Sequence, residues 1–191
     1  ERFSRHKHAV GEMPLKSIEF CLKSTGIKPS DIDIVAYPWS YQALLDRRAE
    51  YFWRTIFTKP SRAYKKFFKC KRELSGQHKF INQILAESGF DVNKTKIRWV
   101  EHHLAHAASA FYLSGVDEGG VLSIDGGGEI TATLLGYARD NKIIKIKEIV
   151  APDSLGNFYS TMTDYLGFER EDGEYKVMGM APYGDASKIN F

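Results

Sequence analysis

Three of the six histidines in this chain lie within five consecutive positions, at residues 102, 103 and 106. Residues four apart share one face of a helix, so His102 and His106 can direct their imidazole rings at one point. Imidazole is a good ligand for a borderline cation such as zinc or iron, whereas His103 would point elsewhere. The alternative is a set of polar residues at the start of a helix. No HExxH sequence is present, which disfavours a zincin-type peptidase.

A second candidate is the run from Asp125 through Gly126, Gly127 and Gly128, with Thr131 three residues further on. Glycine has no Cβ, so the backbone N–H groups of such a turn can approach an anion closely. Asp125 could bind a metal directly or through water, and Thr131 could donate to a phosphate. The run fits neither the Rossmann nor the Walker pattern. The structural alternative is a glycine-rich hairpin turn with Asp125 as a turn former.

A third candidate is the stretch from Lys176 to Gly184, which includes Gly179. Lys176 carries a point charge suited to a phosphate or a carboxylate, and Gly179 could let the chain approach a ligand. The structural alternative is a loop with an exposed lysine. No Ser-His-Asp or Cys-His arrangement is supported by residue order or spacing.

Residues 59–72 form a basic segment without any acidic residue, in which Tyr64, Phe67 and Phe68 interleave with the cations. A nucleic-acid surface has this composition. A helix whose lysine and arginine stems cover apolar surface has it too, and we prefer this interpretation because a single basic run is commonly a solvated face. The cations are Lys59, Arg62, Lys65, Lys66, Lys69, Lys71 and Arg72.

The composition limits the class of protein. A length of 191 residues predicts one domain or little more, and 12 Phe, 10 Tyr and 3 Trp exclude disorder as the main state. A net charge of +3 does not by itself imply nucleic acid. Cys21 and Cys70 do not make a disulfide scaffold, which fits a reducing compartment. Without an apolar run of membrane length or a signal peptide, we expect a soluble, cytoplasmic protein.

Helical and strand patterns alternate along the chain, which predicts a mixed α/β fold. A first helix should run from Leu15 to Gly26, where glycine ends it. Residues 32–37 read as a buried strand, and apolar residues from Tyr41 to Ile56 share a helical face. The next expected elements are a helix at 81–88, a strand at 97–100 and a helix at 102–113.

Three strands, expected at 120–125, 130–138 and 143–150, follow with short connections. Residues 139–142 read as a tight hairpin, so the strands should form an antiparallel meander. Ser154 should cap a helix that extends to Gly167.

A meander with an acid–glycine turn between its first two strands, then a helix, resembles the start of one half of the actin–sugar kinase–Hsp70 fold, which is ribonuclease H-like. Five ordered motifs more specifically resemble the O-carbamoyltransferases of nodulation-factor and antibiotic pathways, relatives of the tRNA threonylcarbamoyl transferases. Residues 41–96 contain no matching motif. The motifs occupy residues 1–8, 101–111, 125–129, 154–160 and 176–184.

The resemblance implies nucleotide-linked carbamoyl transfer to a hydroxyl-bearing acceptor, from carbamoyl adenylate that a separate C-terminal domain makes from carbamoyl phosphate and ATP. His102, His106 and Asp125 would hold Fe(II) or another divalent metal, with Mg²⁺ as a further candidate, and another aspartate would come from beyond Phe191. His103 would be the general base on the acceptor hydroxyl. The nucleotide and its phosphates would contact Gly126, Gly127, Gly128, Thr131, Lys176 and Gly179.

The resemblance also implies that residues 1–191 are an incomplete actin-like domain. Residues 1–118 would be the end of its first half, with an insertion near 41–96, and residues 119–191 the start of its second half. The first strands would precede Glu1, and the adenylating domain would be absent. We expect this piece to be inactive alone, and the whole protein to be a candidate homodimer.

Three other functions remain open at this point. One is an ATP-dependent phosphotransferase of the sugar-kinase branch, which would leave the paired histidines unused. Another is a non-enzymatic nucleotide-binding protein of the actin-like branch. The last is a tRNA threonylcarbamoyl transferase, although we do not expect nucleic acid as a partner, because the charge does not require it.

Overall fold

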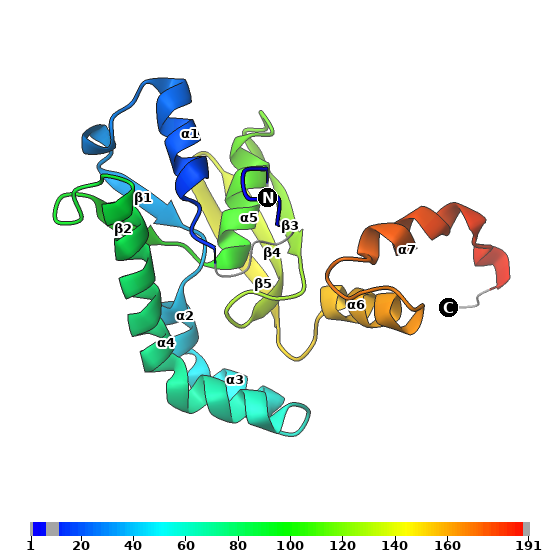
Figure 1. The fold of residues 1–191 in the computed structure, drawn as a ribbon. Helices are drawn as coiled ribbons and strands as arrows, with labels where there is room; N and C mark the ends of the chain where they lie inside the picture. Colours follow the sequence, from blue (N-terminus) through cyan, green and yellow to red (C-terminus); the bar gives the residue numbers. More distant parts are fainter. Residues whose placement is uncertain (1, 7–11, 189–191) are drawn as a thin grey trace.

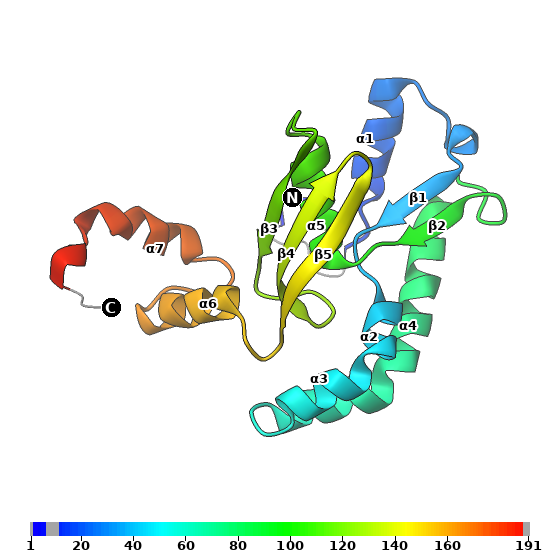
Figure 2. The same ribbon diagram turned by 180° about the vertical axis from the view of Figure 1, so that it is seen from behind.

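The computed structural model describes residues 2–6 and 12–188. It contains a two-stranded sheet and a three-stranded sheet with helices packed around them, so the expected mixed α/β class is confirmed (Figures 1 and 2). The opening loop and the motif at residues 1–8 lie partly outside the described residues. No helix in the described part combines the length and the apolar character needed to cross a membrane.

The first unit consists of helix α1 (Leu15–Thr25) and two short parallel strands, β1 (Ile34–Tyr37) and β2 (Lys96–Trp99). Gly26 ends α1 in the left-handed conformation with φ 69°, as its position in the sequence predicts. β1 begins two residues later than expected because the chain first makes a 3₁₀ turn at Pro29–Asp31.

The prediction that β1 is a buried strand was wrong. Only one face of the two-stranded sheet packs against the core, through Val35 and Tyr37 of β1 and the matching residues of β2. The opposite face is open, and Ile34 on it is 53% exposed. A two-stranded sheet covered on one side buries only alternate residues, whatever their hydrophobicity.

Three helices follow β1: α2 (Tyr41–Asp46), α3 (Arg48–Thr55) and α4 (Pro60–Glu87). The sequence predicted a helical face at 41–56, favoured a helix for the basic segment at 59–72 and predicted a separate helix at 81–88. α4 joins the last two in one continuous helix of 28 residues that begins with Pro60 in its first turn. We call residues 41–73 the helical arm. α3 lies along the first half of α4 and extends away from both sheets (Figure 1).

The second unit is the predicted meander of β3 (Glu118–Ile124), β4 (Thr131–Arg139) and β5 (Lys142–Val150). Helix α5 (His102–Tyr112) packs on one of its faces. The residues buried between them are Ala107, Phe111, Val121, Leu134 and Ala138.

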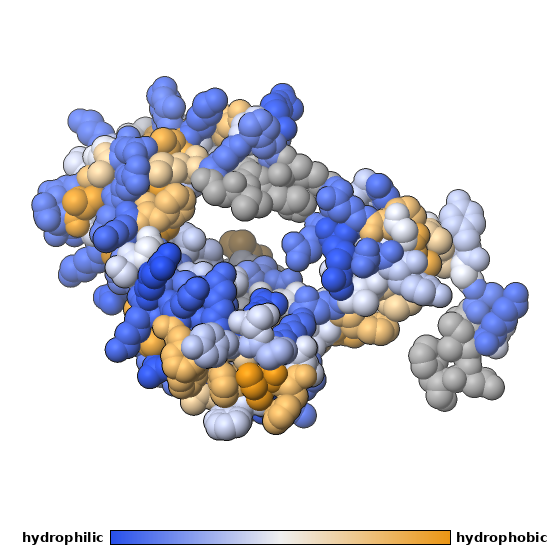
Figure 3. Space-filling model, turned by 60° about the horizontal axis from the view of Figure 1, so that its bottom comes forward, coloured by the Kyte–Doolittle hydropathy of each residue, from blue (hydrophilic) through white to orange (hydrophobic). Residues whose placement is uncertain are grey.

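Many apolar side chains remain on the surface of the described part (Figure 3). Leu122 of β3 and Ile146 of β5 are 61% and 63% exposed. The meander therefore presents apolar side chains on its surface, which is typical of a face that meets another part of a protein.

After β5 the chain leaves the meander through α6 (Leu155–Tyr165) and α7 (Glu174–Met180), which lie to one side of both sheets (Figures 1 and 2). Ser154 caps α6 as predicted, since its hydroxyl accepts the backbone N–H of Asn157 at 3.0 Å. The interpretation of residues 176–184 as a loop was wrong for most of that stretch. α7 forms there with Glu174 in its first turn, where a negative charge is favourable, and a 3₁₀ turn continues it at Ala181–Tyr183.

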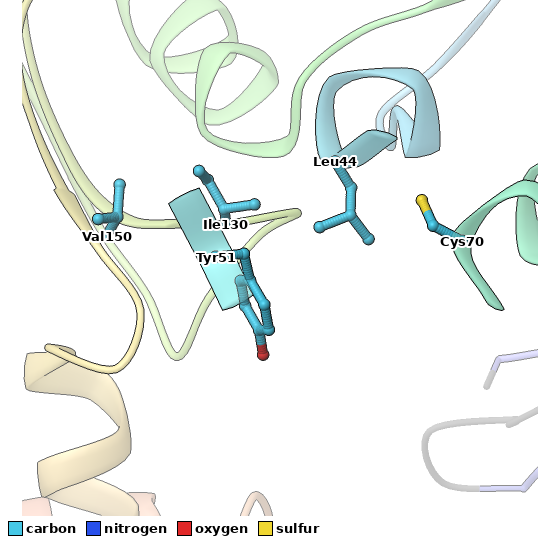
Figure 4. Packing of buried hydrophobic residues seen from close by; sticks show 5 residues of the cluster. All are labelled: Leu44, Tyr51, Cys70, Ile130 and Val150. Carbon is cyan, nitrogen blue, oxygen red and sulfur yellow. The ribbon is translucent and has the colours of Figure 1, made fainter. Parts of the chain in front are cut away.

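A small core joins the helical arm to the meander (Figure 4). Leu44, Tyr51 and Cys70 of the arm pack with Ile130 and Val150, and none of the five is more than 5% exposed. Because Ile130 directly precedes β4 and Val150 ends β5, this cluster fixes the arm against the end of the sheet that carries the glycine-rich turn.

An ionic network beside this core also joins the helical arm to the meander. Glu148 of β5 lies 3.0 Å from Arg47 of the arm and 3.3 Å from Lys145, and it accepts the hydroxyl of Thr131 at 2.7 Å. Burial alone would raise the pKa of Glu148. The hydrogen bond from Thr131 and the charges of Lys145 and Arg47 outweigh burial and hold that pKa below its usual range.

Leu44→Ala should lower the free energy of unfolding by about 2–5 kcal/mol, since it leaves a cavity at a fully buried position. Leu122→Ala removes the same atoms from an exposed position and should change stability by about 0.5 kcal/mol or less. Urea unfolding curves compare the two variants, and equal effects would show that the arm does not pack on the sheet.

Glu148 should make stability fall in acid. Its pKa is lower in the folded chain, so its contribution is complete above the ordinary pKa of a glutamate, about 4.3, and is lost as the pH falls below it. Unfolding curves of the wild type and Glu148→Gln between pH 3 and 7 test this. The two should differ most near neutrality and converge in acid, and a constant difference would contradict the assignment.

Candidate metal centre

The side chains of His102, His106 and Asp125 converge on one point. The Nε2 atoms of the two histidines are 3.1 Å apart. The Oδ2 atom of Asp125 is 2.7 Å from Nε2 of His102 and 3.6 Å from Nε2 of His106. The structure thus brings together the two histidines expected from helical spacing and an aspartate 19 positions beyond His106.

A buried carboxylate places these residues. Glu129, 7% exposed, accepts the backbone N–H of His102 with both oxygens at 3.2 Å, and that of Ser40 at 2.5 Å. His102 is the first residue of α5, whose N-cap residue, Glu101, makes no side-chain cap. Glu129 therefore supplies from the glycine-rich turn the negative charge that a helix N-terminus favours.

Glu129 is the functional residue that sequence reasoning missed. It belongs to the motif at residues 125–129, but its partners lie 27 and 89 positions away along the chain. The one signal was an acidic residue that closes the run of glycines, and this cannot identify a distant helix end.

Asp125 is oriented by its own turn. Its Oδ1 atom accepts the backbone N–H of Gly126 at 2.6 Å, which leaves Oδ2 to face the two histidines. Burial alone would raise the pKa of Asp125, but hydrogen bonds from His102 and from the Gly126 N–H, with the charges of both histidines, hold it below its usual range. The carboxylate is therefore ionised, as a metal ligand must be.

His103 points away from this cluster, as predicted, and is only 3% exposed. Its Nδ1 lies 2.8 Å from the Ser123 hydroxyl, and among the described residues its Nε2 meets no hydrogen-bond partner. Burial, and then the neighbouring His102, lowers the pKa of His103, so the imidazole is neutral. It is not among the residues that line the adjoining cavity, so its role as general base remains a prediction.

Two glycines lie close to other groups in this site, and the contact at Gly156 excludes any larger residue. A Cβ on Gly128 would lie 3.0 Å from Cβ of His102, and one on Gly156 would lie 2.5 Å from the backbone of Asp125 and Gly126. The carbonyl of Gly126 also accepts hydrogen bonds from Ser154 and Asn157, each at 2.9 Å. The start of α6 is thus attached to the glycine-rich turn.

A cavity of about 760 Å³ adjoins the cluster. One wall is the turn from Asp125 to Glu129, a second is the start of α6 at 154–157, and a third comes from the helical arm. Trp39 also lines this cavity, and its ring centroid lies 5.1 Å from that of His102. The predicted phosphate contacts Gly126, Gly127 and Gly128 all border this space.

Three other predicted contacts lie outside the cavity wall. Thr131 is buried and donates its hydroxyl to Glu148. Lys176 and Gly179 lie in α7, where the ammonium of Lys176 is 5.7 Å from the ring centroids of Phe168 and Tyr175. The described part of the chain does not bring Lys176 or Gly179 to the glycine-rich turn. Thr131 meets the turn only through its backbone, since its carbonyl accepts the N–H of Gly128 at 2.7 Å while its hydroxyl turns to Glu148.

The sequence matches the family described as Carbamoyltransferase N-terminus over residues 1–190. The chain belongs to the carbamoyltransferase family. The resemblance inferred from the five motifs is therefore confirmed.

Relatives of this carbamoyltransferase chain are found among curated proteins. It is 36% identical over 185 residues to nodulation protein NolNO of Sinorhizobium fredii, covering 97% of this chain and 25% of that protein. It is 32% identical over 196 residues to an uncharacterised protein of Synechocystis, covering 100% of this chain and 31% of that protein. It is also 42% identical over 89 residues to nodulation protein NolO of Bradyrhizobium diazoefficiens, covering 47% of this chain and 16% of that protein. The chain thus spans about a quarter to a third of the first two relatives.

The cluster of this carbamoyltransferase chain fits a divalent metal. Two imidazole nitrogens and one carboxylate oxygen are the donor set of the facial triad that binds non-haem Fe(II). Ligand atoms that each lie about 2.1 Å from one ion are about 3.0–3.4 Å apart. The separation of 3.1 Å lies in this range, and those of 2.7 and 3.6 Å lie just below and just above it, so small side-chain adjustments would complete the site.

Glu129→Ala should lower the free energy of unfolding by about 2–5 kcal/mol, because two backbone N–H groups lose their acceptor at about 1–3 kcal/mol each. Glu129→Gln keeps one acceptor and should lose less. Glu118→Ala is the matched control, because Glu118 forms its ion pair with Arg139 at an exposed position. It should lower the free energy of unfolding by less than about 1 kcal/mol. Urea unfolding measures all three, and a loss at Glu129 no larger than at Glu118 would exclude the capping role.

Proposed function

We propose that this chain is part of the transfer domain of an enzyme that moves a carbamoyl group from carbamoyl adenylate to a hydroxyl of a small-molecule or sugar acceptor. The single observation that carries the proposal is that Asp125 belongs both to the metal-ligand cluster and to the wall of the cavity. The family match over residues 1–190 supplies the reaction class. A metal-polarised group and a phosphate-binding turn can therefore act on one bound molecule.

The architecture proposed for the whole protein is actin-like. In it, β1 and β2 would belong to the first half and the meander from β3 to β5 would open the second half. The insertion would lie near residues 41–96, which include the helical arm. A further domain would make carbamoyl adenylate from carbamoyl phosphate and ATP. The antiparallel order β3-β4-β5 with the acid–glycine turn between β3 and β4 supports this assignment.

In the proposed site, His102, His106 and Asp125 hold Fe(II) or another divalent metal, which would act as a Lewis acid on the carbamoyl adenylate. The Gly126 N–H keeps Asp125 turned toward the histidines, and Glu129 keeps His102 at the start of α5. The open backbone at Gly126–Gly128 leaves room for a phosphate next to the carboxylate. Trp39 lines the cavity beside His102 and would provide an apolar surface next to the metal ligands.

The proposed reaction is an acyl substitution. The acceptor oxygen bonds to the carbamoyl carbon, the bond from that carbon to the phosphate oxygen breaks, AMP leaves, and the acceptor proton passes to a base. His103 is the proposed base. Since its Nδ1 is held by Ser123, Nε2 would take the proton, and the acceptor would have to reach this buried atom.

His106→Ala in the full-length protein should lower the bound metal at least about tenfold and carbamoyl transfer by at least as much. The side chain of His106 is 52% exposed, so the variant should remain folded. His78→Ala is the control, because His78 stacks on Trp99 at 4.5 Å outside the site and should leave both unchanged. Metal analysis and transfer from supplied carbamoyl adenylate provide the two measurements, and full activity of His106→Ala without metal would refute the mechanism.

A further inference from the structure

The structure separates the basic segment at residues 59–72 into two groups. Lys59, Arg62 and Lys66 are spaced by three and four positions, so they share one face of the arm, and all three line the large cavity. The other four cations are exposed and do not line it. They are Lys65, Lys69, Lys71 and Arg72. The basic segment is therefore not simply a solvated face, because part of it forms the cavity wall opposite the glycine-rich turn.

Two of the three cations in that wall are available to a ligand. Lys66 is already engaged, with its ammonium 3.4 Å from Glu73 and 5.0 Å from the ring centroid of Tyr41. Lys59 and Arg62 make no ion pair within the described residues. Side chains that carry unpaired positive charge into a cavity are suited to an anion.

Four carboxylates line the same cavity, those of Asp125, Glu129, Glu171 and Glu174, and three of them are engaged elsewhere. Asp125 faces the two histidines, and Glu129 accepts backbone N–H groups. Glu174, at the far side, accepts the Ser160 hydroxyl at 2.6 Å and the Glu171 N–H at 2.9 Å. None of them reaches Lys59 or Arg62 within ion-pair distance, so the two cations are left for a bound molecule.

The position of this cationic wall is fixed by buried contacts. Tyr51 packs against Ile130 and Val150, and in Figure 4 its hydroxyl points away from these two side chains. Burial raises the pKa of Tyr51, while the positive charge of Arg62 opposes the shift, as expected for a guanidinium near the phenol. The backbone N–H of Lys59 also bonds to the carbonyl of Thr55, one turn after Tyr51, at 2.7 Å. These contacts therefore fix the position of the cationic wall relative to the glycine-rich turn.

We propose that Lys59 and Arg62 bind the phosphate of the nucleotide that lies over Gly126–Gly128, so that the helical arm forms half of the nucleotide site. This inference rests on the proposed function. A cavity of about 760 Å³ falls within the usual range for small-molecule sites, about 300–1,000 Å³. Arg62 supplies a planar fork that matches two phosphate oxygens, and Lys59 supplies a point charge.

The test uses the full-length protein supplied with preformed carbamoyl adenylate, which isolates the transfer site from adenylate formation. Arg62→Ala and Lys59→Ala should each raise the KM for carbamoyl adenylate and the inhibition constant of AMP about tenfold, with kcat changed less than about twofold. Arg62→Lys keeps the charge but loses the fork, and should fall between Arg62→Ala and the wild type. Lys65→Ala and Lys69→Ala, on the same helix but outside the wall, are the matched controls and should not change either constant.

Calorimetric titration with AMP provides a measurement independent of turnover. The double variant Lys59→Ala/Arg62→Ala should lose, or weaken about tenfold, one class of AMP site while its metal content stays unchanged. If KM, the inhibition constant and AMP binding all match the wild type, the inference is wrong. A rise confined to the KM of the acceptor would also overturn it, since it would assign the wall to the acceptor. Failure of the wild type to transfer carbamoyl would count against the proposed function instead, and the calorimetry would still decide the inference.

Discussion

The hydrogen bonds from two backbone N–H groups to the buried carboxylate of Glu129 fix the geometry on which the rest of the site depends. One N–H belongs to Ser40, at the start of the helical arm, and the other to His102, at the start of α5. A carboxylate removed from water needs such donors, and helix N-termini carry N–H groups without partners. The N–H groups gain an acceptor and the carboxylate gains donors. The segments that contain Ser40, His102 and Glu129, which are far apart in sequence, are therefore held together.

The two glycines that approach other groups closely have the same origin. The turn must bring Glu129 under α5 while Asp125 faces the histidines of that helix, so a Cβ at Gly128 would press on the side chain of His102 at 3.0 Å. Gly156 meets the turn from the other side, where α6 begins. The candidate metal-ligand cluster, the cavity wall at Gly126–Gly128 and the start of α6 therefore share one short stretch of backbone. A small displacement of any of these segments must move the others, because close-packed groups transmit strain to their neighbours.

The helical arm gives this site a second side. This segment carries no family motif, yet the buried cluster of Leu44, Tyr51 and Cys70 with Ile130 and Val150 attaches it to the sheet end that carries the turn. The ion pair between Arg47 and Glu148 reinforces the same junction. The arm is thus positioned by apolar packing and an ion pair, and its charged face points into the cavity as a result.

Local features of this protein were determined by the sequence itself. The left-handed Gly26, the Ser154 cap, the hairpin meander and the paired faces of His102 and His106 depend on neighbours within about four positions or on a regular alternation, so pattern alone specifies them. The resemblance of five motifs to the carbamoyltransferases added Asp125 to these two histidines as a third expected ligand. Tertiary structure decided the rest: that Glu129 caps a distant helix, that Thr131 turns to Glu148, that His103 is buried, and that three of seven cations face inward. Each of these features is set by contacts between segments that are remote in sequence. The hydrophobicity, charge and spacing of residues do not specify which distant partner a side chain will contact.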